Sequence, residues 1–222
     1  MLKKIKEAGK KIYRKLSPLF SEEFLWHLAQ KFEKRFWNKW FKKNLRTMDK
    51  QWLDIVSEFF ELKETDDFKN KILVDIGAGP IGILTRLNAK EKIAVDPLPI
   101  DSVDKSIRRI KSPGEEIPLK SDFADNVFLY NVLQHVIRPE KVLQEGTRIL
   151  KPGGKFYILE QLNLPRDPGH PHSLKLEMFD KWIEENNFEI IKKIVKNNHS
   201  LGYNLPAPGT GYVVLCLIVA KK

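Results

Sequence analysis

Three closely spaced glycines and one aspartate are the residues of this sequence whose types and spacing most clearly indicate a binding chemistry. Gly77, Gly79 and Gly82 follow one short apolar run, and Asp96 follows the next one. Glycine lets the main chain turn sharply and lets a ligand approach it closely. An acid at the carboxyl end of a parallel strand can hold both hydroxyls of a ribose. The pattern therefore predicts a site for a nucleotide-containing cofactor.

Two strands and a helix are needed to bring these residues together. Lys71 to Ile76 and Lys92 to Val95 are apolar, β-branched runs that are typical of buried parallel strands. Ile81 to Leu87 predicts the start of a helix whose free N–H groups face the glycine loop. In a doubly wound sheet the two strands are neighbours, so Asp96 comes close to the loop. We therefore expect an α/β fold.

The glycine pattern fits more than one class of cofactor. Three glycines with an acid 19 positions after the first also form a dinucleotide fingerprint. Asp75 before the loop and Pro80 within it, in the stretch V-D-I-G-A-G-P, favour a different family. This stretch resembles the first motif of the class I S-adenosylmethionine-dependent methyltransferases, whose second motif ends in an acid like Asp96. The L-K-P-G-G turn at 150–154 is a second match, and the two matches together outweigh the nicotinamide alternative.

The resemblance covers about residues 71–220 and implies a fold, a cofactor and a set of binding residues. The implied fold is a three-layer α/β/α, Rossmann-like sheet of seven strands with the last one antiparallel, and the cofactor is S-adenosyl-L-methionine. Pro113 stands where the family often has Asp, so adenine recognition falls to main-chain N–H groups or to Glu115. The expected cofactor-binding residues are Asp75, Gly77, Ala78, Gly79, Pro80, Gly82, Asp96, Pro97, Leu98, Glu115, Glu116, Ile117, Asn131 and Val132.

Three histidines and a glutamate are candidate catalytic residues. In the family, the fourth strand ends where the methyl donor meets the acceptor, and a histidine is often near the position of His135. Methyl transfer needs mainly orientation, but a hydroxyl acceptor calls for a base, and imidazole has a suitable pKa. His170 and His172 lie in the loop after the fifth strand, and Glu160 is expected to be the last residue of that strand. The alternative for each histidine is a hydrogen bond in the cleft wall or a solvated side chain.

All of the excess positive charge lies in the N-terminal fifth of the chain. Residues 1–46 contain 14 Lys and Arg and four Glu, a net charge of +10, which equals the net charge of the whole chain. Residues 1–16 form a basic amphipathic pattern that suits an anionic membrane surface, a nucleic acid, or packing on its own domain. Phe24 to Asn44, rich in aromatic residues, and Thr47 to Leu62 predict two further helices.

The sequence is therefore divided into a basic, aromatic-rich helical extension at 1–65 and a methyltransferase domain at 66–222. In the family that the domain resembles, a variable N-terminal helical segment commonly covers the cofactor cleft and shapes the substrate site. Within the domain, Asp101 to Ile110 predicts a short helix. Phe188 to Val195 and Gly211 to Ala220 predict a closing antiparallel hairpin.

The composition limits the remaining options. Cys216 is the only cysteine, so an internal disulfide is excluded and no metal site is expected. No apolar stretch approaches the about 20 residues of a membrane span, and the N-terminus lacks the apolar segment of a signal peptide. We expect a soluble, cytoplasmic protein, with peripheral membrane contact through residues 1–20 as one option.

The nature of the acceptor is the least determined part of the prediction. Tyr130, Asn131 and Val132 stand where enzymes that methylate amino groups of bases carry an N-P-P-Y-type motif. The V-D-P-L after the second strand and the F-W-N-K-W-F helix resemble methyltransferases of surface-polysaccharide or lipid-linked sugar synthesis. The predicted reaction is O-methylation of a small-molecule acceptor, a saccharide or a lipid-linked sugar. The alternatives are an RNA methyltransferase and a non-catalytic cofactor-binding partner subunit.

Overall fold

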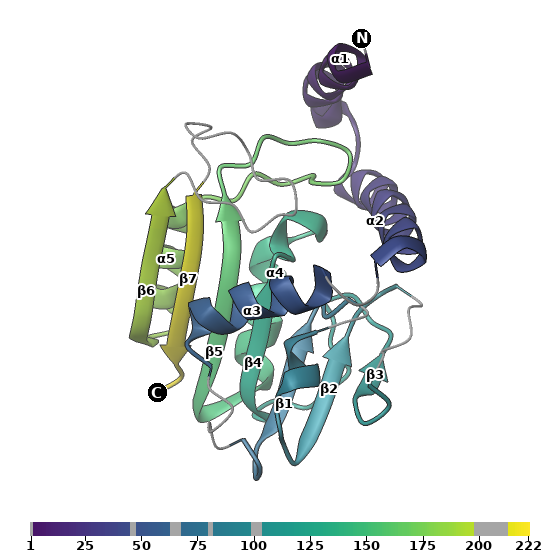
Figure 1. Cartoon of the computed structure of the whole chain (residues 1–222). Coiled ribbons are helices and arrows are strands. Elements are labelled where there is room, and N and C mark those ends of the chain that lie inside the picture. Colours follow the sequence, from purple (N-terminus) through teal and green to yellow (C-terminus); the bar gives the residue numbers. More distant parts are fainter. Residues whose placement is uncertain (1, 45–47, 63–67, 80–81, 99–103, 198–212) are drawn as a thin grey trace.

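A seven-stranded sheet forms the centre of the computed structural model (Figure 1). The described residues are 2–44, 48–62, 68–79, 82–98, 104–197 and 213–222, and for 2–8, 39–44 and 48–52 the description covers the backbone alone. The strands are β1 (Ile72–Ile76), β2 (Glu91–Val95), β3 (Arg108–Ile110), β4 (Ala124–Tyr130), β5 (Leu150–Leu162), β6 (Glu189–Asn197) and β7 (Val213–Ala220). Their order is β3-β2-β1-β4-β5-β7-β6, and β7 alone runs antiparallel to its neighbours. The predicted α/β sheet of seven strands with an antiparallel last strand is confirmed.

Helices cover both faces of the sheet (Figure 1). One face packs against α4 (Pro139–Ile149) and α5 (Leu176–Glu185), where the Phe156 and Trp182 rings meet edge to face at 5.5 Å. The other face packs against α3 (Met48–Phe60), whose buried residues join those of β1, β4 and β5. The central strands are mostly apolar because both of their faces are buried. This arrangement gives the three layers that the sequence predicts.

Two helices before α3 lie outside these layers. α1 (Leu2–Leu16) leads through a short 3-10 turn into α2 (Glu22–Asn44). Figure 1 shows α1 protruding from the body and α2 lying beyond the end of the sheet to which the β1, β2 and β4 arrows point. Ion pairs connect both helices to the body: Lys10 of α1 pairs with Asp167, and Glu22 of α2 pairs with Arg138. The second pair is exposed on both sides and contributes little to stability. α2 therefore borders the edge of the sheet at which ligands of open α/β folds bind.

The prediction of a helix from Asp101 to Ile110 is wrong for the part that the structure describes, which excludes residues 99–103. The chain forms a turn at Asp104, whose carboxylate accepts a bond from the Ser106 N–H (2.8 Å) and pairs with Lys92 (2.9 Å). β3 then pairs with β2. An aspartate that bonds to the main chain two residues further on favours a turn over a helix.

The helix predicted from Ile81 to Leu87 is reduced to one 3-10 turn, Ile83–Arg86, and Ile81 itself lies outside the described residues. The N–H of Ile83 donates to the hydroxyl of Tyr130 (2.9 Å), and Leu87 already has an extended backbone. No full helix therefore directs its N-terminus at the glycine loop within the described residues.

The ends of the fifth strand also differ from the prediction. β5 begins at Leu150, so that L-K-P-G-G lies inside the strand as an irregularity in its pairing with β4. Gly153, with a φ of +74°, accommodates the extra residues there. The strand continues to Leu162, two residues beyond the expected end at Glu160.

Candidate active site

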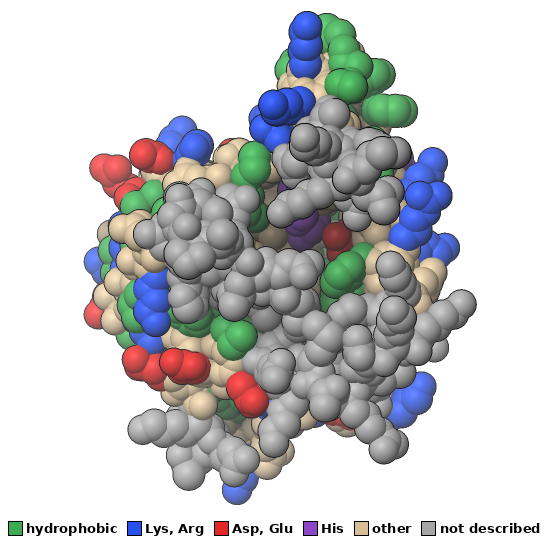
Figure 2. Space-filling model, turned by 45° about the horizontal axis from the view of Figure 1, so that its top comes forward, with side chains coloured by type: hydrophobic (Ala, Val, Ile, Leu, Met, Phe, Trp, Pro, Cys, Tyr) green, Lys and Arg blue, Asp and Glu red, His purple; other side chains and the backbone are tan. Residues whose placement is uncertain are grey.

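A cavity of about 920 Å³ lies at the carboxyl ends of β1, β2 and β4. The glycine loop and the residues after β2 and β4 form one side of it, and α2 and the loop after β5 form the other. Figure 2 shows a histidine and an acidic side chain recessed in this face of the molecule, below the protruding α1. Ligands of open α/β sheets bind at this edge. The lining includes Trp26, Phe32, Glu33, Phe36, Trp37, Gly77, Gly79, Asp96, Glu115, Asn131, Val132, His135 and His170.

The glycine loop has the conformation that its residue types predict. Gly77 and Gly79 have φ angles of +69° and +56°, which residues with a Cβ rarely adopt. A Cβ on Gly77 would lie 2.5 Å from a methyl of Val132, and a Cβ on Gly79 would lie 3.3 Å from the ring of Trp37. The loop is thus packed between the end of β4 and helix α2. Pro80 lies outside the described residues.

Asp96 ties this loop to the end of β2. One carboxylate oxygen accepts the N–H of Gly79 and the other accepts the N–H of Leu98, both at 2.8 Å. Burial raises the pKa of Asp96, and the two main-chain hydrogen bonds and the charge of Arg109 oppose that rise. Each oxygen has one such main-chain donor and retains further lone-pair capacity. Asp96 can therefore still accept hydrogen bonds from two ligand hydroxyls.

Asp75 lies beneath the glycine loop. Its carboxyl group is fully buried, and the Tyr130 hydroxyl donates to Oδ2 at 3.3 Å, while Oδ1 has no hydrogen-bond partner among the described residues. Burial raises the pKa of Asp75 well above its usual value, and Tyr130 opposes the rise. A Cβ on Gly82 would overlap the Asp75 carboxylate. Gly82 therefore makes room for the buried acid.

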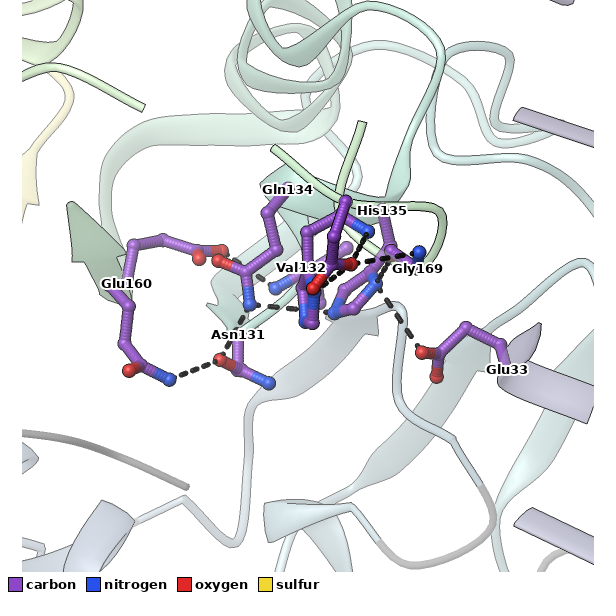
Figure 3. Close-up of polar contacts among 10 residues, drawn as sticks. Glu33, Asn131, Val132, Gln134, His135, Glu160 and Gly169 are labelled. Carbon is purple, nitrogen blue, oxygen red and sulfur yellow. Dashed lines mark hydrogen bonds and ion pairs between the residues drawn. The ribbon is translucent and has the colours of Figure 1, made fainter. Parts of the chain in front are cut away.

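His135 lies at the centre of a polar cluster (Figure 3). Its Nδ1 is 2.8 Å from the carbonyl of Gly169 and 3.4 Å from Oε1 of Glu33, and its Nε2 is 3.4 Å from the amide nitrogen of Gln134. These partners fit a proton on Nδ1, which donates, and a lone pair on Nε2, which accepts. Burial, together with the charge of His170, lowers the pKa of His135 to about 3. The ring is therefore neutral near pH 7.

The two histidines of the loop after β5 have different environments. The ring of His170 lies 4.7 Å from that of His135, and its Nδ1 is 2.9 Å from the carboxylate of Asp167. Lys10 of α1 pairs with the same carboxylate at 3.1 Å. Burial raises the pKa of Asp167, but His170 and Lys10 together hold it below its ordinary value. His172 bonds to a main-chain carbonyl and is not among the residues that line the cavity.

Glu160 is buried behind the end of β4. Its Oε1 accepts the N–H groups of Val132 (2.8 Å) and Leu133 (3.0 Å), and Oε2 has no partner among the residues that the structure describes. Burial raises the pKa of Glu160 to about 7, and the two main-chain bonds oppose the rise. Next to it, Asn131 has a φ of +56°, and its side-chain oxygen accepts a bond from Gln134. Glu160 therefore shapes the turn after β4 from outside the cavity.

The acid-containing turn before β4 reaches the cavity through Glu115. The Glu115 side chain is buried, and its Oε1 accepts the N–H groups of Ile137 (2.7 Å) and Arg138 (3.1 Å). Glu116 is exposed and Ile117 packs in the core, and neither lines the cavity. Of these three predicted residues, Glu115 is the one placed to meet a ligand.

Most of the predicted site residues come together in this cavity. Those that line it are Gly77, Ala78, Gly79, Asp96, Pro97, Leu98, Glu115, Asn131, Val132, His135 and His170. Those described elsewhere in the fold are Asp75, Gly82, Glu116, Ile117, Glu160 and His172.

The resemblance implies that an N-terminal helical segment covers the cleft, but none of the predicted site residues belongs to α2, whose side chains form one wall of the cavity. Trp26, Phe32, Phe36 and Trp37 all line the cavity, together with Glu33. One signal was available. Glu33 is the only acid between residues 24 and 48, a stretch that contains seven Lys and Arg.

The strand order, the glycine loop and Asp96 define a Rossmann-like, cofactor-binding fold of the methyltransferase type. A family model described as a methyltransferase domain matches residues 69–158, from just before β1 into β5. Residues 69–158 therefore form part of a methyltransferase domain of the class I S-adenosylmethionine-dependent type, and the cofactor of this domain is S-adenosylmethionine.

Similar proteins include curated enzymes and solved structures. The ubiquinone/menaquinone biosynthesis C-methyltransferase UbiE of Pectobacterium atrosepticum is 30% identical over 97 residues, 43% of this chain and 39% of that protein. The chloroplastic 2-methyl-6-phytyl-1,4-hydroquinone methyltransferase of Spinacia oleracea is 26% identical over 102 residues, 41% of this chain and 30% of that protein. The chain thus spans less than two thirds of either relative.

The fold is shared with 1,6-didemethyltoxoflavin-N1-methyltransferase of Burkholderia thailandensis, solved with S-adenosylhomocysteine. The TM-score is 0.61 at 13% identity, with 91% of each chain covered. At 13% identity, this similarity shows that the two proteins share a fold and nothing more.

Proposed function

We propose that this protein transfers the methyl group of S-adenosylmethionine to a hydroxyl-bearing aromatic acceptor that carries an apolar chain. The observation that carries the proposal is the composition of the cavity. The glycine loop and Asp96 form one side, and the aromatic side chains of α2 form the other. In this proposal residues 1–65 cover the domain formed by residues 66–222.

The residues on the sheet side of the cavity fit the cofactor. Asp96 is buried yet keeps lone pairs for two hydroxyls, as a ribose requires. Gly77 and Gly79 leave the main chain open to close approach, and Leu98 and Glu115 would border the adenine. When bound, the cofactor supplies an activated methyl group. These residues would fix its position relative to the acceptor, which is the main requirement of the reaction.

The aromatic wall supports the choice of acceptor. Trp26, Phe32, Phe36 and Trp37 come from one helix and face the cavity, and rings of this kind bind flat apolar molecules well. The names of the two curated relatives describe a phytyl-substituted hydroquinone and the biosynthesis of quinones. Loss of the hydroxyl proton activates such a ring for methylation at oxygen or at the neighbouring carbon.

The acceptor class is tested with methyl-labelled S-adenosylmethionine and three probes: a decyl-substituted hydroquinone kept reduced, a decyl glucoside and a single-stranded RNA. We expect the label in the hydroquinone, and mass spectrometry of the product identifies the methylated atom. Label in the glucoside or the RNA would contradict the proposal in favour of a saccharide or RNA acceptor. Binding of S-adenosylhomocysteine without transfer to any probe would favour a non-catalytic partner subunit.

We further propose that α1 and the start of α2 bind an anionic membrane surface, where an acceptor with an apolar chain would reside. Ile12, Leu16, Leu19, Phe20 and Phe24 are 43–78% exposed. Figure 2 shows hydrophobic and basic side chains together on this protrusion. Apolar side chains beside lysines and arginines are the features of helices that lie in a lipid interface. No helix in the described ranges is both long and apolar enough to cross a membrane.

We expect the wild-type protein to sediment with vesicles that contain phosphatidylglycerol, and Leu19→Glu to reduce this binding about tenfold, because it places a charge in the lipid interface. The matched control is Ile191→Glu, which changes an exposed isoleucine of β6 and should leave vesicle binding unchanged. Equal binding of both variants and the wild type would contradict the membrane proposal.

A further inference from the structure

Glu33 is a carboxylate that α2 contributes to the wall of the cavity. Its side chain is 21% exposed, and its Oε1 lies 3.4 Å from Nδ1 of His135. Figure 3 shows Glu33 pointing from its helix toward the imidazole, on the side opposite Glu160. Trp37 donates a hydrogen bond to the same carboxylate. Glu33 is thus held by a hydrogen bond from a ring of its own helix and lies beside a ring that follows β4.

The other ionisable groups of the cavity are already engaged. His135 has partners at both ring nitrogens, and its lowered pKa makes it a weak base. His170 is bonded through Nδ1 to Asp167, and Asp167 also pairs with Lys10. One oxygen of Asp96 accepts the N–H of Gly79 in the glycine loop, and the other accepts the N–H of Leu98 after β2. Glu115, like Asp96, accepts main-chain N–H groups, whereas the described contacts of the Glu33 carboxylate are with the rings of Trp37 and His135.

From this geometry we infer that Glu33 is the catalytic base that takes the hydroxyl proton of the acceptor. The inference rests on the proposed function, because it requires an acceptor with an ionisable hydroxyl. It adds a catalytic residue from the helical extension, which lies outside the part of the chain that matches the methyltransferase domain.

The reaction balances in protons and charge. For transfer to oxygen, the acceptor oxygen forms a bond to the methyl carbon, and the bond between that carbon and the sulfonium sulfur breaks. The O–H proton moves to the Glu33 carboxylate. The products are the methyl ether, a neutral thioether and protonated Glu33, which then releases its proton to water.

The electrostatic surroundings suit this role. Burial raises the pKa of Glu33 to about 7; the charge of His170 and the hydrogen bond from Trp37 oppose the rise, and Asp96 and Asp167 add to it. A base with a pKa near the working pH accepts a proton readily and also returns it. Because Glu33 must be ionised to act, the rate should rise with pH through about 7 and level off above it.

The test compares Glu33→Gln with Glu23→Gln, an exposed acid of the same helix, using the decyl hydroquinone and saturating S-adenosylmethionine. We expect Glu33→Gln to lower kcat about 100-fold and to lose the rise of rate through pH 7. Affinity for S-adenosylhomocysteine, measured by calorimetry, should stay within about threefold of the wild type. Glu23→Gln should behave as the wild type in both measurements.

Two results would overturn the inference about Glu33. One is an unchanged kcat in Glu33→Gln. The other is a loss of cofactor affinity with kcat retained, which would make Glu33 a cofactor ligand. If the wild type binds the cofactor but does not methylate the probe, the proposed acceptor is wrong. The inference about Glu33 is then tested without turnover, by infrared titration of the carboxyl bands. A band that titrates near pH 7 and is lost in Glu33→Gln supports the inference. Because burial also raises the pKa of Glu160 to about 7, retention of every such band in Glu33→Gln contradicts it.

Discussion

Asp96→Asn should lose about 100-fold in affinity for S-adenosylmethionine and S-adenosylhomocysteine. The variant replaces a carboxylate that accepts the N–H groups of Gly79 and Leu98 and has capacity left for two ligand hydroxyls. An amide offers one acceptor oxygen, and its NH₂ group would face one of these N–H groups. Hydrogen bonds to a charged group contribute about 1.5–3 kcal/mol each, so losing one to two of them corresponds to about a 100-fold loss.

Calorimetric titration measures this loss, and thermal unfolding in the same buffer shows whether the variant is folded. The midpoint of thermal unfolding should fall only modestly, because the loss of one main-chain hydrogen bond is partly offset by removal of a charge that burial disfavours. Asp180→Asn, an exposed acid on α5, is the matched control. Wild-type affinity in Asp96→Asn would show that the ribose lies elsewhere.

Glu160→Gln should be more stable than the wild type at pH 8 by up to about 3 kcal/mol and equally stable at pH 4.5. Burial raises the pKa of Glu160 from its ordinary 4.5 to about 7. Between these two pH values the Glu160 carboxyl is therefore protonated in the folded state and ionised in the unfolded state. The stability that this protonated carboxyl contributes is fully present below about pH 4.5 and is lost as the pH rises through about 7. Gln has no proton to lose, and its oxygen can still accept from Val132 and Leu133.

Urea unfolding at the two pH values measures the free energy of unfolding of the wild type and of Glu160→Gln. The pH dependence caused by Glu33 is common to both proteins, so the difference between them reports on Glu160. The exposed Glu116→Gln should show no such pH-dependent gain. If Glu160→Gln were less stable than the wild type at pH 8, the ionised carboxylate would be a net stabilising group, contrary to its burial without a partner for Oε2.

The sheet could be predicted because its strands are local features of the sequence. Ile72–Ile76 and Val213–Ala220 are apolar runs that remain recognisable without knowledge of their neighbours. The segment around Asp104 could not be assigned in this way. Its turn depends on contacts of one carboxylate with Ser106 and Lys92, and the strand that follows is only three residues long.

The candidate site was predictable in its cofactor half and not in its acceptor half. Asp96 meets Gly79 because adjacent parallel strands have their carboxyl ends at the same edge of the sheet. The spacing of the two strands in the sequence was therefore enough to predict this contact. Glu33 meets His135 only because α2 lies beyond the carboxyl ends of the strands, and the spacing of the two residues in the sequence does not predict that contact. Whether His135, His170, His172 or Glu160 takes part in catalysis remains a prediction, and alanine replacement of each with measurement of turnover tests it.

The aromatic wall of α2 has an evolutionary consequence. The cofactor side of the cavity is formed by the loops of the sheet, whereas Trp26, Phe32 and Phe36 come from a helix that belongs to neither covering layer. Substitutions on this helix can change the shape of the acceptor space without disturbing the strands that place Asp96. On the proposed function, a lineage could acquire new acceptors by altering about three turns of one helix, while the residues proposed to bind the methyl donor stay as they are.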